Sequence, residues 1–442
     1  MIGKLARGIS PVAFQDIIEA GTGVLRRVRP ARKDDANPLF APERPWEGRA
    51  LIVPSVCREP ATGLWRMWYA AHGVIPKRSI LCYAESDDGR AWRRPDLGLV
   101  EFQGSKANNI VLVEEMDAIS VYLDPTAAPE ERYRLFSDCK AGTANGGYIF
   151  TMASADGLRW RLLHDRMIPV RNDSQNTGLK DPYTGKWVCY HRPGHLVRTV
   201  ARSESPDGQT WGVIRQVMTP DTFDQLQGLE HYAIAVFPYD GGFLGLLRIY
   251  DTRWDRLTSW VEAVVSRDGI RWQRLPDRTP LVGLGPDGAW DSRLITPGHA
   301  LVEEGAGHWF YYDSWNARHD GELGEPHARS CIGRAFIPRR RFFECAAQRE
   351  KSTLTTHPLL LESDALLLDA VSPAPGIRAS LSLPDGATPA GFAAADSTVL
   401  TGDVPSGRID FAGGSLARFA GQPVRITLHM PRGSSAFGMG CA

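Results

Sequence analysis

The turn sequence Ser-x-Asp-Gly-x-x-Trp occurs four times in this chain, and it constrains the fold more than any other feature. The copies are Ser86–Trp92, Ser154–Trp160, Ser205–Trp211 and Ser266–Trp272. Each copy follows a short apolar run, and Asp-Gly supplies the positive φ angle that a tight hairpin turn needs. We expect the tryptophan of each copy to start the next strand. Self-similarity at intervals of roughly 50 to 70 residues indicates a propeller or another repeat array.

Around each turn a longer pattern repeats. An apolar strand, a turn and an aromatic-rich strand come before the strand that leads into Asp-Gly, as in Ala50–Val56 followed by Leu64–Tyr69. Five such units fit the chain, at residues 46–115, 116–170, 171–225, 226–285 and 286–347. The fifth has Arg339-Arg340-Arg341-Phe342 where the others have the turn. Four strands per unit is the content of one propeller blade, so the pattern predicts an all-β, five-bladed β-propeller.

The blade pattern ends near residue 350. Beyond it, alternating runs predict a small C-terminal β-sandwich-like domain, with an irregular tail as the alternative; the runs are Leu366–Ala370, Ile377–Leu383, Ser406–Phe411 and Pro423–His429. We therefore divide the chain into an N-terminal lead-in segment (1–45), the propeller (46–350) and the C-terminal β domain (351–442).

Composition excludes several classes of protein. Lys and Arg number 51 and Asp and Glu number 51, and no basic run suggests a nucleic-acid-binding stripe. No apolar stretch is long enough to span a membrane, and the first residues lack the apolar core of a signal peptide. The seven cysteines form no Cys-x-x-Cys pair and fit reduced packing residues. We expect a cytoplasmic protein without nucleic-acid or membrane partners, and the sequence leaves its oligomeric state open.

Several segments carry a resemblance that runs over nearly the whole chain. They are Asn37-Pro38-Leu39-Phe40, Pro45-Trp46-Glu47-Gly48, Tyr83–Phe102, Asn108-Asn109-Ile110 and Leu416–Arg425. In these the chain resembles the five-bladed propeller glycoside hydrolases of the family 32/43/68 type, in a bacterial branch of that group. The Trp-Met-Asn-Asp-Pro-type segment of invertases is absent. The resemblance implies a propeller enzyme that acts on glycosides through paired carboxylates.

An acidic residue lies a few residues before the start of each predicted innermost strand. These acids are Glu47, Asp117, Asp173, Glu230 and Asp291. The innermost strands of a propeller line its channel, so residues at their starts converge at one mouth. Glycosidic cleavage uses two carboxyl groups, of which one protonates the leaving oxygen and the other acts as nucleophile or activates water. We predict catalytic roles for Asp173, Glu230, Asp291 and Glu47, in that order; the alternative for each is a turn cap or an ion pair with arginine.

Polar and aromatic residues near strand ends complete the predicted pocket. The predicted substrate contacts are Asn176, His231, Tyr232, Arg192, His195, Arg248, Trp254, Trp315, Asp117 and His72. We expect His231 and Tyr232 to orient Glu230. Because the histidines show no His-x-His or His-Glu-x-x-His spacing and no phosphate-binding glycine motif is present, we expect no transition metal and no cofactor. A hard cation held in the channel by the acids stays an open alternative.

The function that we predict is hydrolysis or transglycosylation of a small glycoside or oligosaccharide. Two alternatives remain open. One is a repurposed propeller enzyme that performs acid–base cyclisation or elimination on a non-sugar metabolite, which one acid in an apolar pocket would favour. The other is a non-catalytic carbohydrate- or protein-binding propeller, which channel-mouth acids paired with arginines would favour. Propellers host many functions, so the fold alone does not decide.

Overall fold

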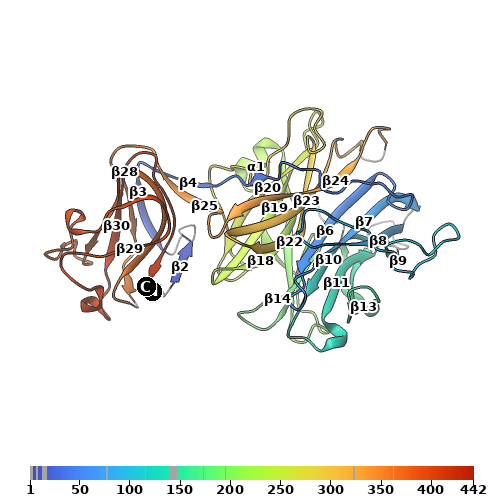
Figure 1. Ribbon diagram of the computed structural model, residues 1–442, viewed down its shortest axis with the longest axis horizontal. Coiled ribbons are helices and arrows are strands. Elements are labelled where there is room, and N and C mark those ends of the chain that lie inside the picture. Colours follow the sequence, from blue (N-terminus) through green and yellow to red (C-terminus); the bar gives the residue numbers. More distant parts are fainter. Residues whose placement is uncertain are drawn as a thin grey trace.

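Five antiparallel sheets of four strands follow one another along the described chain and form the blades of a propeller (Figure 1). The structure is a computed structural model that describes residues 3–5, 8–11, 17–75, 78–114, 116–139, 147–172, 174–194, 196–321, 324–361 and 363–442. The first strands of neighbouring blades contact one another and are therefore innermost. The predicted all-β, five-bladed propeller with a C-terminal β domain is confirmed.

The blades follow the units expected from the repeat. Blade one comprises β6 (Ala50–Arg58), β7 (Trp65–Ile75), β8 (Arg78–Ser86) and β9 (Ile110–Glu114). Blade two comprises β10 (Met116–Leu123), β11 (Tyr133–Cys139), β12 (Gly147–Ser154) and β13 (Arg161–Asn172), with the short helix η1 (Pro129–Glu131) before β11. Blade three comprises β14 (Thr177–Lys180), β15 (Trp187–His191), β16 (Val200–Ser205) and β17 (Arg215–Met218). Helix α1 (Thr222–Gln227) leads into blade four, which comprises β18 (Leu229–Tyr239), β19 (Gly242–Asp251), β20 (Thr258–Ser266) and β21 (Trp272–Arg274).

Blade five takes its fourth strand from the start of the chain. Its own strands are β22 (Leu294–Glu304), β23 (Gly307–Trp315) and β24 (Ser330–Pro338), and the fourth is β5 (Arg32–Lys33). Lys33 pairs with Ala335 and Arg32 with Phe336. The fifth unit lacks the Asp-Gly turn that would return the chain, so β24 would otherwise keep an open edge. The N-terminal segment covers that edge and closes the ring.

Each Asp-Gly turn is a tight loop held by its own serine and aspartate. In the second copy the Ser154 hydroxyl donates to Asp156 Oδ1 at 3.0 Å, and the same oxygen accepts the backbone N–H of Leu158 and Arg159, both at 2.8 Å. Gly157 has a φ of +74°. The expectation that the tryptophan starts the next strand is confirmed only in the fourth copy, where β21 begins at Trp272. In the other three copies the tryptophan precedes the fourth strand.

The turns fasten each blade to the preceding one. Trp68 and Arg66 of blade one donate to the carbonyls of Gly157 and Asp156 at 2.6 and 2.5 Å. In the same way, Tyr190 of blade three donates to Gly269 O at 2.8 Å. The repeated glycine therefore serves a second purpose besides its φ angle, since a Cβ on Gly157 would lie 2.6 Å from the Trp68 ring. The repeated Asp-Gly turn therefore contacts and holds the neighbouring blade.

Hydroxyl groups join each blade to the inner strand of the next blade around the channel. Ser120 of β10 donates to Asn176 O at 2.5 Å, and Thr177 of β14 donates to Ile234 O of β18 at 2.8 Å. Other serines make the remaining links: Ser259 donates to Ile295 O at 3.2 Å, Ser330 to Leu51 O at 2.8 Å, and Ser79 to Met116 O. These bonds satisfy backbone carbonyls that lie at sheet edges. They hold the starts of the inner strands in register at one mouth of the channel.

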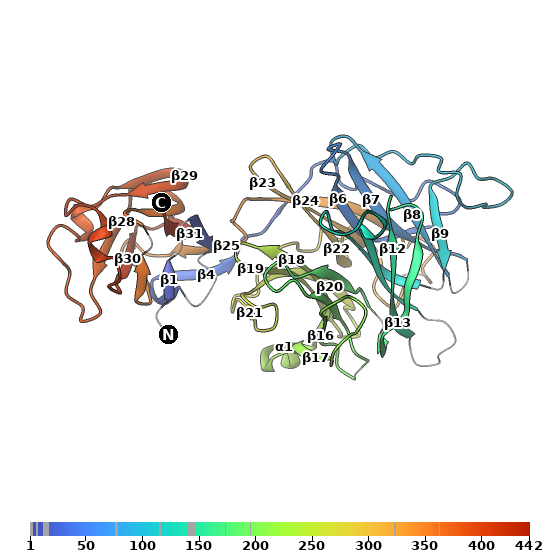
Figure 2. The ribbon, with the colours of Figure 1, turned by 90° about the horizontal axis from the view of Figure 1, so that it is seen from below.

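The C-terminal domain lies beside the propeller and contains strands from both chain ends (Figures 1 and 2). Its main sheet comprises β2 (Gly8–Pro11), β3 (Ile18–Thr22), β4 (Val24–Val28), β25 (Phe343–Ala347), β26 (Ser352–Thr356), β28 (Leu366–Ser382), β29 (Leu400–Ile409), β30 (Arg425–Met430) and β31 (Ser435–Cys441). The parallel pair β1 (Gly3–Leu5) and β27 (Leu359–Leu361) and the short helices η2 (Ala394–Asp396) and η3 (Leu416–Phe419) complete it.

The antiparallel pair β4 and β25 runs between the two parts (Figure 1). The N-terminal residues thus contribute strands to the C-terminal domain and, through β5, to the propeller. No helix among the described residues is long and apolar enough to cross a membrane.

Candidate active site

One mouth of the channel carries an ionisable or imidazole side chain on the second strand of every blade. These residues are His72 on β7, Asp138 on β11, His191 on β15, Arg248 on β19 and Asp313 on β23. Their register places several of them near the starts of the inner strands: Ala50 pairs with His72, Asp117 with Asp138, and Thr296 with Asp313. Blades arranged around one axis bring these positions toward the same opening. This mouth is the candidate active site.

Tyr232 on β18 lies at the centre of a group of positive charges. The guanidinium carbons of Arg248, Arg192 and Arg198 lie 4.2, 4.5 and 5.2 Å from the centroid of its ring. These distances are those of cation–π contacts. The Tyr232 hydroxyl is 2.9 Å from His319 Nε2. We call Arg192, Arg198 and Arg248 the arginine cluster.

Glu230 is the acid that lies beside this cluster. Arg198 Nη1 donates to Glu230 Oε2 at 2.6 Å, and the two side chains are 30% and 15% exposed. Arg198 contacts both the Glu230 carboxylate and the Tyr232 ring, so these two side chains lie on the same side of β18. Arg198 also lies 4.8 Å from the ring centroid of Tyr250, the residue that pairs with Glu230. Glu230 is thus a positioned carboxylate that solvent reaches.

Arg248 is buried at the inner side of the cluster. Only 7% of the residue is exposed, and its Nε donates to Ser259 Oγ at 3.0 Å. Within the described part of the chain, no carboxylate lies within ion-pair distance of Arg248. A buried charge without an ionic partner costs free energy. Its terminal nitrogens are therefore candidates for binding an anion.

Asp313 lies where the inner strands of blades one and five meet. The residue is 1% exposed, and its Oδ1 accepts the backbone N–H of Val53 at 2.7 Å. Burial raises the pKa of Asp313 to about 7, although the Val53 N–H and the charge of Arg248 oppose the rise. Oδ2 makes no hydrogen bond of ordinary geometry among the described residues, although the neighbouring Thr296 hydroxyl also opposes the rise in the pKa. A carboxyl group with this pKa can give or take a proton near neutral pH.

A strained backbone directs Val53 toward Asp313. Val53 has a φ of +48°, and β6 is bulged against β7 between Ile52 and Ser55. A positive φ is unusual for a β-branched residue, and such strain concentrates at functional sites. The bulge turns the Val53 N–H out of the ladder and onto the carboxyl group.

Blade three contributes buried polar atoms that lack partners. Both atoms of the Asn176 amide and Oε1 of Gln175 have no hydrogen-bond partner in the described ranges. Gln175 Nε2 donates to Pro297 O at 2.8 Å and so links blade three to blade five. Burial lowers the pKa of His191 to about 4, and its Nε2 lies 3.1 Å from Ser203 Oγ. Unsatisfied buried polar atoms are rare in native proteins and mark places where water or a ligand binds.

Glu47, a predicted catalytic acid, is fully buried and held on both oxygens. Its Oε1 accepts from the Tyr69 hydroxyl at 2.6 Å and from Arg94 Nε at 2.7 Å. Its Oε2 accepts the backbone N–H of Glu43 at 2.8 Å and of Arg44 at 3.0 Å. This arrangement anchors the loop before β6 to blade one. We therefore leave Glu47 out of the candidate site.

Asp291, also predicted to be catalytic, holds the closing strand. Its Oδ2 accepts from Lys33 Nζ of β5 at 2.6 Å, and the adjacent Trp290 stacks on Tyr312 at a centroid distance of 5.6 Å.

Asp173 lies outside the described residues. The backbone of Asp117 belongs to β10, but its side chain lies outside the described part. The predicted roles of Asp173 and Asp117 stay predictions.

Three of the predicted substrate contacts, Tyr232, Arg192 and Arg248, meet in the group around Tyr232. His231 lies on the opposite face of β18 and does not orient Glu230. Its Nε2 is 3.3 Å from Asp224 Oδ2, and burial lowers its pKa. His231 also contacts Arg274, whereas Glu230 and Tyr232 contact Arg198.

The remaining predicted contacts have other surroundings. Trp315 is buried in a cluster with Leu294 and Ala50, and Trp254 is 84% exposed between β19 and β20. His72 Nε2 lies 3.1 Å from Ser79 Oγ. His195 lies outside the described residues. Among the residues that the structure describes, no three His, Cys, Asp or Glu side chains gather as metal ligands would.

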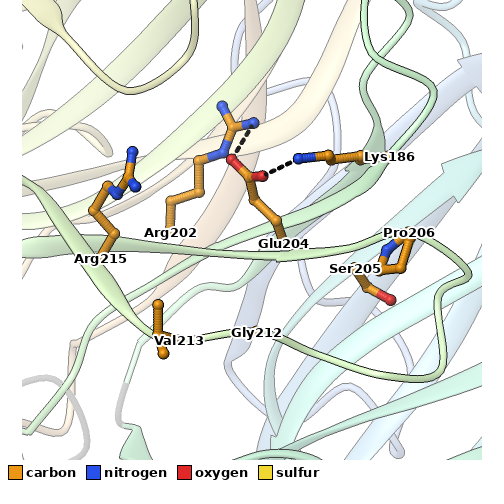
Figure 3. Close-up of a pocket in the computed structure, with 8 residues that line it drawn as sticks. All are labelled: Lys186, Arg202, Glu204, Ser205, Pro206, Gly212, Val213 and Arg215. Carbon is orange, nitrogen blue, oxygen red and sulfur yellow. Dashed lines mark hydrogen bonds and ion pairs between the residues drawn. The ribbon is translucent and has the colours of Figure 1, made fainter.

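A cavity of about 240 Å³ lies away from the channel mouth, on the outer strands of blade three (Figure 3). It is lined by Lys186, Arg202, Glu204, Ser205, Pro206, Gly212, Val213 and Arg215. Glu204 forms ion pairs with Lys186 and Arg202, both at 3.0 Å (Figure 3). Glu204 is the acid of this cavity, and it is already bound by two cations. Because no inner strand lines the cavity either, we assign the cavity no part in the candidate site.

No protein-family model and no curated protein matches the chain. Solved structures do match. An N-acetylgalactosamine deacetylase from F. plautii, in complex with blood group B trisaccharide, has a TM-score of 0.51 and 18% identity, covering 74% of this chain and 97% of its own. A Bacteroides ovatus protein taken to be a glycoside hydrolase has a TM-score of 0.50 and 14% identity, covering 72% and 98%. The chain shares their fold. Sequence identities of 18% and 14% show a shared fold and say nothing about the activity of this chain.

Sequence reasoning missed Asp313, Asp138, His191, Arg198 and His319. It examined the starts of the inner strands, whereas most of these residues lie on or just after the second strands. The sequence does contain a signal for Asp313. Asp313 is the one charged residue in the aromatic run Tyr311-Tyr312-Asp313-Ser314-Trp315, and a carboxyl group in a buried strand is rare unless it has a role.

Proposed function

We propose that the protein is a carbohydrate-active hydrolase that cleaves a small glycoside or oligosaccharide at this mouth of the channel. The observation that carries the proposal is Asp313, a buried carboxyl group whose pKa is raised to about 7 and which lies near Arg248 of the arginine cluster. Strongly perturbed acids in such positions are candidates for acid–base catalysis. The shared fold with proteins that act on carbohydrates supports the same class of substrate, as an analogy of fold.

In this proposal Asp313 donates the proton to the leaving glycosidic oxygen. It holds that proton up to about pH 7, which is the form that a general acid needs. Glu230, held by Arg198, supplies the second carboxylate, which either attacks the sugar or activates water. Tyr232 offers a ring face and the Asn176 amide offers a donor and an acceptor to sugar hydroxyls. The configuration of the product would distinguish attack by Glu230 from activation of water.

A second candidate function is sugar binding without turnover. Glu47, Glu230 and Asp291 each form an ion pair with a cation, which is the pattern expected of a non-catalytic propeller. In that case Asp313 would serve only to order the channel wall. The two functions differ in whether any product forms.

The experiment that separates them is turnover of a panel of aryl glycosides, fructans, arabinans and mixed oligosaccharides, followed by mass spectrometry. We expect Asp313→Asn and Glu230→Gln each to lower kcat by about 100-fold or more, the scale of lost acid–base catalysis. The alkaline limb of the wild-type pH profile should fall near pH 7, where Asp313 loses its proton. Asp173→Asn belongs in the same panel because that residue was the first-ranked acid of the sequence analysis.

Asp291→Asn is the matched control, because that acid pairs with Lys33 away from the arginine cluster. It should retain kcat. Equal loss of activity in Asp291→Asn and Asp313→Asn would argue against Asp313 as the acid. Binding of a sugar by the wild type with no product from any substrate would favour the second candidate.

A further inference from the structure

A tryptophan is exposed at the rim of the channel mouth. Trp254 lies in the turn between β19 and β20, and 84% of it is exposed. The register of blade four places this turn at the mouth, because Asp251, the last residue of β19, pairs with Leu229, the first residue of β18. Tyr232 follows on the same inner strand. A large apolar ring in water at the entrance to a site offers surface that a ligand can bury.

The turn that carries Trp254 is held by hydrogen bonds on both sides of the ring. Asp251 accepts from the backbone N–H of Arg253 at 3.1 Å and from its guanidinium at 2.8 and 2.5 Å. The Arg253 carbonyl accepts the backbone N–H groups of Arg256 and Leu257 at 2.8 and 3.0 Å. Because the backbone is already ordered, a ligand that covers the ring loses little binding free energy to the ordering of the turn.

The same turn is bonded to the residues that surround Tyr232. Arg318 Nη1 donates to the Trp254 carbonyl at 3.2 Å, and the backbone N–H of His319 donates to the Leu257 carbonyl at 3.1 Å. His319 Nε2 in turn lies 2.9 Å from the Tyr232 hydroxyl. A continuous set of contacts thus leads from the inner ring, Tyr232, to the outer ring, Trp254. The two rings belong to one wall of the mouth.

The side chains beside Trp254 indicate which kind of ligand suits it. Asp255 and Arg256 follow it in the turn and are exposed, and Arg318 forms an exposed ion pair with Asp320 at 3.0 Å. A sugar ring has an apolar face of C–H groups and a polar edge of hydroxyls. It can lie on an indole while its hydroxyls form hydrogen bonds with charged neighbours. A wholly apolar group would cover the ring and gain nothing from those neighbours.

We propose that Trp254 forms an outer subsite that binds a second sugar ring, so that the substrate is an oligosaccharide. One sugar unit occupies the inner site at Tyr232 and Glu230, and the next units continue outward over the turn between β19 and β20. That the inner unit is cleaved rests on the proposed function; that Trp254 binds a sugar ring does not.

Equilibrium binding to a variant with impaired turnover tests the subsite separately from cleavage. Isothermal titration calorimetry on Asp313→Asn, or on Glu230→Gln if the first does not fold, would use arabino-, xylo-, manno- and fructo-oligosaccharides of one to five units. Mass spectrometry would show that the probes stay intact. In at least one series we expect a step of about 10-fold in affinity when one unit is added. This is the scale expected when roughly 60 Å² of apolar surface is removed from water.

Substitutions of Trp254 locate the step. Trp254→Ala should abolish it and leave the binding of a single sugar unchanged, whereas Trp254→Phe should keep part of it because a ring remains. Val213→Ala is the control, because Val213 is 86% exposed beside the outer strands of blade three, at the cavity of Figure 3. Acrylamide quenching of tryptophan fluorescence gives a second readout. A bound oligosaccharide should shield the part of the emission that Trp254→Ala removes.

No binding of any probe, no rise in affinity with length, or a step that Trp254→Ala leaves intact would overturn the proposal. So would aryl glycosides that gain as much from Trp254 as oligosaccharides do, because the occupant would then be an apolar group. Failure of the proposed function looks different: the wild type cleaves no oligosaccharide, yet the step in affinity still requires Trp254. Cleavage of single glycosides with no gain from a further sugar would retain the function and reject the outer subsite.

Discussion

At the residue scale, the channel mouth contains two carboxyl groups in opposite surroundings. Asp313 is buried against the backbone of Val53, whereas Glu230 forms a partly exposed ion pair with Arg198. The mouth of the channel therefore presents one carboxyl group shielded from water and one that solvent reaches. The burial that suits Asp313 to proton transfer also opposes its ionisation in the folded protein.

We predict a pH-dependent loss of stability that originates at Asp313. Its pKa is raised from 3.8 to about 7 on folding, so its protonated form is favoured in the native state. The contribution of protonated Asp313 to the free energy of unfolding is complete below the unfolded pKa. It is lost as pH rises toward 7, at up to about 1.4 kcal/mol per pH unit. Asp313→Asn should therefore be more stable than the wild type above about pH 7, and the difference should shrink on acidification. Urea unfolding across this range measures it.

The control for that measurement is Asp410→Asn, at an exposed acid of the C-terminal domain. It should leave the slope of unfolding free energy against pH as it is in the wild type. A wild-type slope that Asp313→Asn leaves intact would show that other groups cause it.

At the element scale, the Asp-Gly turn explains both the repeat and the assembly of the blades. The serine and aspartate close the loop, and backbone N–H donors lower the pKa of Asp207 in the third copy to about 2. The glycine then lets the loop approach the aromatic strand of the preceding blade. In the first copy the Tyr311 hydroxyl of blade five donates to Gly89 O at 2.5 Å, which joins the first blade to the last.

We predict that Gly157→Ala destabilises the protein by about 2–4 kcal/mol. Part of this is the cost of a Cβ at positive φ, and the rest is the collision with Trp68. Gly185→Ala is the matched control, because Gly185 has nearly the same φ, +72°, with no heavy atom within 4 Å of a built Cβ. It should cost only about 1 kcal/mol. Equal losses in denaturant unfolding would refute the role of the turn as a joint between blades.

At the scale of the whole molecule, the ring is closed by contacts between chain segments far apart in sequence. Arg334 on β24 donates from Nε to Asp34 Oδ2 at 2.9 Å and from Nη1 to Gly89 O at 2.9 Å. One buried side chain thus joins the N-terminal segment, blade one and blade five. The same N-terminal residues continue into the C-terminal domain through β4, so closure and domain attachment depend on one stretch of chain.

We predict that Arg334→Gln lowers the free energy of unfolding by about 3–5 kcal/mol, because it leaves the buried Asp34 without its main partner. Arg339→Gln removes an exposed pair on the same blade and should cost less than about 1 kcal/mol. Adding Asp34→Asn to Arg334→Gln should recover part of the loss. Additive losses in this double-mutant cycle would mean that the pair does not couple the segments.

The candidate site was predictable only in part. Tyr232, Glu230, Arg192 and Arg248 follow from the rule that strand ends converge at the channel mouth, and the structure brings them together. The same rule also selected Glu47, which the structure buries beneath Tyr69 and Arg94. An acid before a strand looks alike in sequence whether it faces the channel or a neighbouring arginine, because its partner is remote along the chain.

The sequence by itself determined that the chain is a five-bladed repeat array, because the Asp-Gly turn is specified by adjacent residues and recurs at blade spacing in four of the five units. Tertiary structure alone decided that β5 completes blade five and that Asp313 is buried under Val53. It also decided that Arg248 lacks an ion pair in the described part of the chain. Turn chemistry acts over a few residues, whereas burial and charge balance depend on segments that only folding brings together.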